Sequence, residues 1–228
     1  MPETDTPLTS IRARIDAACA GAGRAPQSVT LLAVSKTRGA DEIAALADQG
    51  QRHFGENYLQ EALDKMPALA DRGLEWHFIG PIQSNKTRAI AEHFDWVHSV
   101  DRLKIAQRLS DQRPEALPAL NICLQVNISG EDSKSGVTLA ELPALAEAVA
   151  ALPRLRLRGL MAIPAPADSS EQRRVPLAAL REAATQLSLP LDTLSMGMSD
   201  DLTEAVQEGA TIVRIGTALF GQRQYPQP

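Results

Sequence analysis

The sequence has 228 residues, of which 44% are hydrophobic and 22% are charged, a composition typical of a globular protein with a sizeable core. Its formal net charge of −5 argues against a general nucleic-acid binder, which needs a basic surface. The acidic start, "MPETDTPLTS", lacks the apolar core of a signal peptide, and no run approaches the roughly 18 apolar residues of a membrane span. We therefore expect a soluble, cytoplasmic protein.

The first expected element is an N-terminal helix over residues 8–23, with Thr9 or Ser10 as its cap. Gly21 and Gly23 end this helix. They superficially suggest a dinucleotide-binding loop, but they follow a helix rather than a strand, and the third glycine of that motif is missing. We interpret them as helix-ending glycines.

After this helix, short apolar or β-branched runs alternate with amphipathic helical patterns. The eight expected strands span residues 29–35, 52–57, 75–80, 95–100, 120–128, 155–163, 191–197 and 211–216. Such alternation predicts parallel strands joined by right-handed crossovers, and eight units favour a closed (β/α)8 barrel over an open sheet. The second strand has the weakest pattern, because it is short and contains Gly55.

No second domain is visible, so residues 1–228 are predicted to form a single α/β barrel domain. We expect "APADSSEQRR", residues 165–174, to be a mobile loop after the sixth strand, and the final "QYPQP" to be a short frayed tail. Cys19 falls in a helical pattern and Cys123 in an apolar strand. Both are expected to be buried, reduced thiols.

The run "LLAVSKTR", residues 31–38, places Lys36 where the first strand ends. A lysine emerging from a strand is usually just a surface residue. In a (β/α)8 barrel, however, side chains at the carboxyl ends of the strands line the functional site. The same argument places Asn57 at the end of the second strand and His77 at the end of the third. Lys36 therefore becomes a candidate site residue.

The last two strands end in motifs that suit a phosphate. "SMGMS" and "RIGT" are small, hydroxyl-containing turns that open helices, so Ser199, Gly216 and Thr217 stand where amides and hydroxyls can hold a dianion. The alternative is that they are ordinary helix caps and turn glycines. Arg214 shares a face of its strand with Gly216, and a guanidinium inside a barrel needs a carboxylate or a ligand as its partner.

Other chemistries find less support in the sequence. The four histidines show no metal-ligand spacing, so no metal site is predicted. There is no G-x-S-x-G motif of a serine hydrolase and no P-loop. Taken alone, His77 between Trp76 and Phe78 is typical of a packed histidine with a satisfied hydrogen bond. Lys134 lies in the polar stretch 129–136, which is either a solvated loop or an anion-binding rim.

An amine at the end of one strand and a phosphate site at the ends of two others are complementary to a phosphorylated aldehyde. An unprotonated amine attacks carbonyl groups, and a dry pocket with a nearby cation lowers an amine's pKa toward neutrality. Pyridoxal 5′-phosphate (PLP) fits this description. A phosphosugar-type barrel enzyme that uses Lys36 as a Schiff-base lysine is an alternative.

Six stretches together carry a family resemblance: "LLAVSKTR", "FGENYLQE", "WHFIGPIQSNK", "SKSG", "LRGLMAI" and "LSMGMSDDLTEAVQEGATIVRIGTALFG". They resemble the YggS/PROSC family of pyridoxal-phosphate homeostasis proteins, over residues 29–223. That family is similar to the barrel domain of fold-type III PLP enzymes such as alanine racemase. The resemblance implies that Lys36 holds PLP as a Schiff base and that Ser199, Gly216 and Thr217 bind its phosphate.

By the same resemblance, Arg214 matches the racemase arginine that faces the pyridine nitrogen of PLP, and Asn57 and His77 lie near the pocket. An arginine there disfavours protonation of the ring nitrogen, which makes the ring a weaker electron sink. The expected cofactor-binding set is Lys36, Asn57, His77, Ser199, Arg214, Gly216 and Thr217, and no catalytic residue is assigned.

The sequence also departs from the racemase pattern. "TRGADE" follows Lys36 where racemases carry "ANAYGHG", whose tyrosine helps to bind the phosphate. Racemases also take a second catalytic base, a tyrosine, from a C-terminal β-domain of the partner subunit, whereas this sequence ends at Pro228. Neither of its two tyrosines, Tyr58 and Tyr225, is placed as that base.

Two functions follow as hypotheses. The first is a non-catalytic, monomeric carrier that buffers PLP in the cell and delivers it to apo-enzymes that depend on it. The second is a PLP-dependent enzyme such as a one-base amino-acid racemase. Neither hypothesis requires a nucleic-acid or membrane partner.

Overall fold

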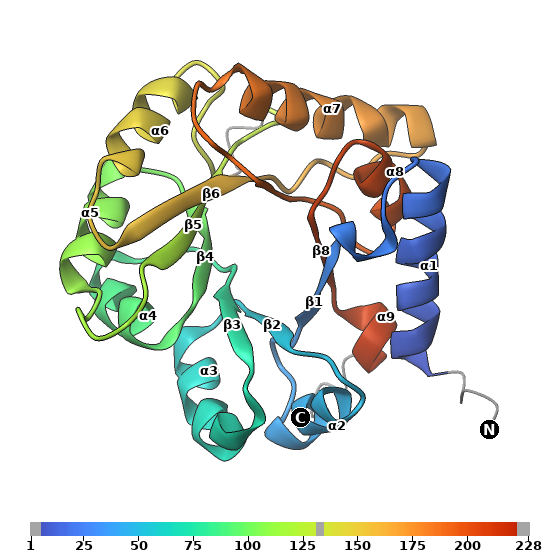
Figure 1. Cartoon of the computed structure of the whole chain (residues 1–228), viewed down its shortest axis with the longest axis horizontal. Helices are drawn as coiled ribbons and strands as arrows, with labels where there is room; N and C mark the ends of the chain where they lie inside the picture. Colours follow the sequence, from blue (N-terminus) through green and yellow to red (C-terminus); the bar gives the residue numbers. More distant parts are fainter. Residues whose placement is uncertain (1–5, 131–134, 223–228) are drawn as a thin grey trace, which may run out of the picture.

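The computed structural model describes residues 6–130 and 135–222. Its eight strands form a closed barrel in which all neighbouring strands are parallel and β1 pairs with β8 (Figure 1). The strands are β1 (Thr30–Val34), β2 (His53–Glu56), β3 (Glu75–Phe78), β4 (Trp96–Val100), β5 (Leu120–Gln125), β6 (Leu155–Met161), β7 (Thr193–Ser195) and β8 (Ile212–Ile215). The predicted (β/α)8 barrel is confirmed, including its weakly patterned second strand. The predicted tail, 224–228, and Lys134 lie outside the described residues.

Helices surround the barrel as an outer ring (Figure 1). The α-helices are α1 (Pro7–Gly21), α2 (Ala40–Asp48), α3 (Leu59–Lys65), α4 (Thr87–His93), α5 (Leu103–Gln112), α6 (Leu142–Ala150), α7 (Ser170–Gln186), α8 (Leu202–Gln207) and α9 (Thr217–Phe220). The described residues also form three 3-10 helices, η1 (Pro26–Ser28), η2 (Met66–Arg72) and η3 (Ser84–Lys86). The apolar sides of the helices cover the outward-facing residues of the strands, which are therefore buried on both faces.

The hydrophobic core has two parts. The larger part lies between the strands and the outer helices. The smaller part fills the barrel interior and consists of Leu32, Trp96, Cys123, Met161 and Ile212. Alternate residues of each strand point into the barrel interior. Arg214 pairs with the inward-facing Leu32, and His77 pairs with Gly55, so the polar side chains of Arg214 and His77 also lie in the interior.

The structure corrects the start of the first helix. The cap is Thr6 rather than Thr9 or Ser10, because its hydroxyl accepts a hydrogen bond from the Thr9 amide at 3.2 Å. Thr9 instead reaches back, and its hydroxyl oxygen accepts from the Thr6 amide at 2.9 Å. Pro7 stands at the first helical position, where a missing amide hydrogen costs nothing.

Residues 165–174 are not all loop, and that prediction is wrong for 170–174. Helix α7 begins at Ser170, because Ser169 and Gln172 form a reciprocal capping box. The Ser169 hydroxyl accepts from the Gln172 amide at 3.2 Å, and the Gln172 side chain accepts from the Ser169 amide at 3.4 Å. The polar composition of the stretch concealed this helix start.

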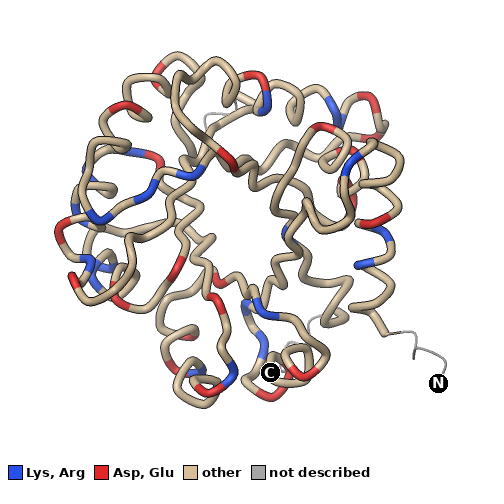
Figure 2. Tube along the Cα trace, viewed as in Figure 1, with Lys and Arg blue, Asp and Glu red and all other residues tan. Residues whose placement is uncertain are grey.

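Charged residues of both signs are interspersed around the outer helices (Figure 2). Cys19 and Cys123 are both buried free thiols, as predicted. Within the described ranges, none of the helices has the length and apolar character needed to cross a bilayer.

Candidate functional site

A cavity of about 600 Å³ opens where β1, β2, β3 and β8 end, beside the loops that follow β6 and β7. It brings together six of the seven predicted site residues: Lys36, Asn57, Ser199, Arg214, Gly216 and Thr217. Its other lining residues are Val34, Arg38, Ile79, Ile163, Met198, Asp200 and Ala218. A second cavity of about 300 Å³ shares Asn57, Ile79 and Ile163 with it. The volume of the main cavity suits a small molecule.

Lys36 stands two residues beyond the end of β1, on a turn with an unusual backbone. The next residue, Thr37, has a φ of 64°, in the left-handed region that a β-branched residue seldom adopts. Such a conformation persists only where the surroundings enforce it. Here the Thr37 amide donates a hydrogen bond of 2.6 Å to the Glu61 carboxylate.

A buried lysine, Lys65 of α3, holds this turn from behind. Its ammonium pairs with the carboxylates of Glu56 at 2.7 Å and Glu61 at 2.8 Å. It also donates to the carbonyl oxygens of Ser35 at 3.0 Å and Arg38 at 3.1 Å, one on each side of the turn. Burial raises the pKa of Glu56, and the charge of Lys65 opposes that rise. The network therefore fixes the backbone that presents the amine to the cavity.

Arg214 of β8 supplies a buried positive charge to the cavity. It is 5% exposed, and its guanidinium donates to the Ser195 hydroxyl and to the Ala162 carbonyl, each at 2.9 Å. Burial lowers the pKa of Arg214 from 12.5 to about 10, although Asp201 partly offsets this. Both hydrogen-bond acceptors are neutral. The cation is therefore available to a ligand with a lone pair or a negative charge.

The loop that carries Ser199 is tightly folded. The Met198 amide donates to the Asp201 carboxylate at 2.6 Å, and a guanidinium from α1, that of Arg14, donates to the Ser199 carbonyl at 3.0 Å. Gly197 has a φ of 98°, and a Cβ at this position would lie 2.5 Å from the Cβ of Ala205. Only glycine fits there, so the loop has little freedom to move Ser199.

Gly216 and Thr217 form the start of α9, beside Ser199 in the same cavity. The Gly216 carbonyl accepts from the amides of Leu219 at 2.9 Å and Phe220 at 3.0 Å. The preceding amides of this first turn, those of Thr217 and Ala218, have no acceptor within the helix. Together with the Ser199 and Thr217 hydroxyls, they provide donors suited to an anion.

Asn57 offers an unsatisfied acceptor at the cavity. Its Oδ1 is buried and lacks a hydrogen-bond partner among the described residues. Gly80 holds the Asn57 backbone closely, since a Cβ on Gly80 would lie 2.2 Å from the Asn57 carbonyl oxygen. A buried amide oxygen without a donor is costly, so this atom is poised to accept a hydrogen bond from a ligand.

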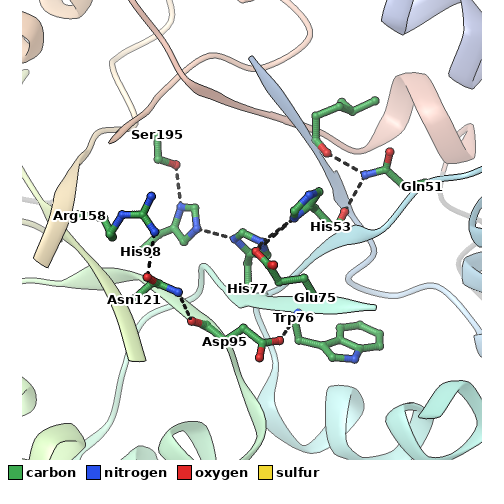
Figure 3. Close-up of polar contacts among 11 residues, drawn as sticks. Gln51, His53, Glu75, Trp76, His77, Asp95, His98, Asn121, Arg158 and Ser195 are labelled. Atoms are coloured by element: carbon green, nitrogen blue, oxygen red, sulfur yellow. Dashed lines mark hydrogen bonds and ion pairs between the residues drawn. The ribbon is translucent and has the colours of Figure 1, made fainter. Parts of the chain in front are cut away.

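His77 is the one predicted site residue that does not line the cavity. It lies inside the barrel at 1% exposure, and its Nδ1 is 2.9 Å from Nε2 of His98. His98 Nδ1 is in turn 2.7 Å from the Ser195 hydroxyl (Figure 3). Arg214 donates to the same hydroxyl. The interpretation of His77 as a packed histidine with a satisfied hydrogen bond is therefore confirmed. This chain of contacts connects His77 to the cavity.

The residues that support the site from behind were not predicted from the sequence. Glu61 and Lys65 are four residues apart on one helix, a spacing that signals an ion pair and that could have been recognised. Their connection to Glu56 and to the Lys36 turn depends on how α3 packs beside β1, which no local pattern reveals. Asp201, which acts on both Arg214 and the Ser199 loop, was likewise overlooked.

The barrel and its carboxyl-end cavity define a class of protein. A family model described as "Alanine racemase, N-terminal domain" matches residues 8–224. An alanine racemase from Corynebacterium glutamicum has the same fold, with a TM-score of 0.64 and 19% identity over 96% of this chain and 62% of that chain. PipY of Synechococcus elongatus, in a structure solved with PLP bound, has a TM-score of 0.80 and 40% identity over 91% of this chain and 100% of that one. This is thus a barrel of the alanine racemase N-terminal-domain class.

Two bacterial proteins are more similar still. The pyridoxal phosphate homeostasis protein of Pseudomonas aeruginosa is 64% identical over 221 residues, which cover 97% of this chain and 96% of that protein. The protein of the same name from Escherichia coli K12 is 58% identical over 225 residues, covering 96% of each chain. The chain belongs to the pyridoxal phosphate homeostasis protein family, and the resemblance noted in its motifs is confirmed.

Proposed function

We propose that this protein binds PLP in the 600 Å³ cavity and serves intracellular PLP homeostasis as a carrier, without substantial catalysis. The observation that carries the proposal is the convergence of Lys36, Ser199 and Arg214, from three separate strand ends, on one cavity. The relative solved with PLP bound, 40% identical over 91% of this chain, supports the same cofactor.

The residues present fit PLP. Ser199, Thr217 and the first-turn amides of α9 provide donors for a phosphate dianion, and Arg214 provides a donor for the pyridine nitrogen. The partnerless Oδ1 of Asn57 provides an acceptor on the same wall. When bound, PLP supplies an aldehyde that a lysine amine can hold reversibly as a Schiff base, and Lys36 is the lysine at this cavity.

The charged groups favour holding the cofactor over turning over amino acids. A guanidinium has only donors, so Arg214 facing the ring nitrogen keeps that nitrogen unprotonated and limits electron withdrawal by the ring. Among the described lining residues, the ionisable side chains are Lys36, Arg38, Asp200 and Arg214. Asp200 is the one carboxylate in that set, and it is exposed. Racemisation through two opposed bases would need a better-placed partner for Lys36.

The first experiment is the absorption spectrum of the purified protein. We expect a visible PLP band that borohydride abolishes by reducing the lysine adduct. Lys36→Ala should remove the band, whereas Lys86→Ala, which changes an exposed lysine of η3 away from the cavity, should keep it. A colourless protein would contradict PLP binding and favour the phosphosugar alternative.

The second experiment separates the carrier from the enzyme. The PLP-loaded protein is mixed with an apo-enzyme that requires PLP, and recovery of that enzyme's activity is followed. In parallel, the loaded protein is assayed for interconversion of amino-acid enantiomers. Recovery without interconversion supports the carrier. Sustained interconversion that Lys36→Ala abolishes would establish the racemase instead, with Asp200 as the first acid–base residue to substitute. We further expect a monomer in size-exclusion chromatography.

A further inference from the structure

A second group of chemistry-bearing side chains lies at the opposite, amino-terminal end of the barrel. His53 begins β2 and Glu75 begins β3, and the two are directly paired in the sheet. His77 follows Glu75 by two residues and therefore shares its inward face. The three side chains converge on one point, drawn in Figure 3. None of them lines the PLP cavity.

The three nearest atoms form an almost equilateral triangle. His53 Nδ1 lies 3.4 Å from His77 Nε2, and each of these nitrogens lies 3.3 Å from Oε1 of Glu75. A charge-assisted hydrogen bond between an imidazole and a carboxylate is shorter, about 2.7–2.9 Å. Ligand atoms held at about 2.0–2.1 Å from a tetrahedral metal ion stand about 3.3–3.4 Å apart. The spacing therefore matches the edges of a metal coordination shell better than it matches hydrogen bonds.

The buried ligand is held in position by its surroundings. The His77 ring stacks on Trp96, with centroids 5.4 Å apart and an interplanar angle of 8°. Its Nδ1 is bonded to His98 Nε2, and His98 Nδ1 is bonded to the Ser195 hydroxyl. When these Nδ1 atoms carry the protons, Nε2 of His77 presents its lone pair toward His53 and Glu75. Metal-binding histidines are oriented in this way by a hydrogen bond from the second ring nitrogen.

The site is open on one side. The side chains of His53 and Glu75 are 35% and 40% exposed, whereas that of His77 is 1% exposed. His53 also lines a cavity of about 400 Å³ at this end of the molecule, together with Leu31, Gln51 and Arg52. A metal ion can enter from solvent, and water can act as its remaining ligand.

We propose that His53, Glu75 and His77 form a binding site for a divalent transition-metal ion of the zinc type, with solvent completing the coordination. Two imidazoles and one carboxylate suit zinc and its neighbours in the first transition row, and not magnesium or calcium, which prefer oxygen ligands alone. The site is separate from the PLP cavity, and its residues come from β2 and β3 alone.

The test is a zinc titration of the full-length protein, free of any tag and treated with chelator, followed by isothermal calorimetry near neutral pH. We expect one Zn²⁺ per chain, with affinity reduced at least about 100-fold in His53→Gln and in Glu75→Gln. Both changes are at half-exposed positions, so the fold should survive, and melting curves check this. His93→Gln is the matched control, because His93 is an exposed histidine on α4 away from the site.

Substitution with Co²⁺ provides a second readout. A four-coordinate site gives an intense visible difference spectrum against the metal-free protein, and this should be absent in His53→Gln. The proposal is overturned if zinc binds equally well to His53→Gln and Glu75→Gln, or if the native protein binds zinc no more tightly than the doubly substituted protein. Lys36→Ala should bind zinc normally, so the outcome is independent of the proposed function.

Discussion

Replacing Lys65 by methionine should expose how the Lys36 turn is held. The substitution keeps the length and apolar stem of the side chain but removes its charge. Glu56, at 0% exposure, loses the ammonium 2.7 Å away, and the carbonyls of Ser35 and Arg38 lose a donor. Removing one partner of a buried ion pair costs about 3–5 kcal/mol, because the remaining charge stays buried without compensation. We expect the free energy of unfolding, measured in urea, to fall by that amount.

Two comparisons give this experiment its specificity. Arg88→Met breaks an exposed helical pair with Glu92, 3.9 Å long and 68% and 38% exposed, and should cost less than about 1 kcal/mol. Adding Glu56→Gln to Lys65→Met removes the orphaned charge, so the double variant should be more stable than Lys65→Met alone. The PLP affinity of Lys65→Met should also fall, because the turn that presents the amine is released.

The pH dependence of the Lys65→Met variant has a definite sign. Burial already raises the pKa of Glu56 above 4.5, and without Lys65 that rise grows because the opposing charge is gone. A carboxyl group with a raised folded-state pKa favours the folded state below its unfolded pKa and loses that contribution as pH rises through the folded pKa. Lys65→Met should therefore approach the native stability at acidic pH and fall behind it as pH rises. Equal losses for Lys65→Met and Arg88→Met, or a pH-independent loss, would refute the reasoning.

Three further outcomes are expected. Thr37→Gly should stabilise the protein by about 1 kcal/mol in urea unfolding, because it relieves a left-handed backbone, whereas Thr37→Ala should gain less. Gly80→Ala should lower stability by about 1–3 kcal/mol and weaken PLP binding, since its Cβ would lie 2.2 Å from the Asn57 carbonyl oxygen; unchanged affinity would contradict the role given to Asn57. Cys123, whose pKa burial raises to about 12, and the buried Cys19 should resist iodoacetamide in the native protein and react in urea, as mass spectrometry can show.

The polarity of the fold explains why the cavity proposed to bind PLP could be found in the sequence. All strands of a parallel barrel end on the same side, so residues at the ends of strands far apart in the chain must meet. The strand boundaries follow from runs of apolar residues. Once these boundaries are correct, Lys36, Ser199 and Thr217 are placed at the same end of the barrel. The resemblance then predicted a role for each of them. His77 was placed near the cavity by the resemblance but lies deeper, because it belongs to a lower layer of the barrel interior.

The amino-terminal cluster could not be found in the same way. Metal-site recognition from sequence relies on ligands with short, regular spacing, whereas His53 lies more than twenty positions before Glu75 and His77. Their meeting depends on the register of β2 against β3, which pairs His53 with Glu75. A shift of one residue would turn His53 outward. The prediction of no metal site rested on the absence of such a spacing pattern, which says nothing about residues that meet across two strands.

A chain of hydrogen bonds runs inside the barrel from Arg214 through Ser195 and His98 to His77. Which residue donates and which accepts in this chain depends on which ring nitrogen of each histidine carries the proton. Arg214 can only donate, so Ser195 accepts from it and can either accept from His98 or donate to it. In the first case the proton of His77 sits on Nδ1 and Nε2 carries a lone pair. In the second, Nε2 carries the proton and donates toward Glu75. A metal ion at the amino-terminal end would select the first arrangement, which leaves the Ser195 hydroxyl proton free to turn away from His98. With both proposed sites occupied, a change at the amino-terminal end would therefore alter the hydrogen bonding around the Arg214 guanidinium.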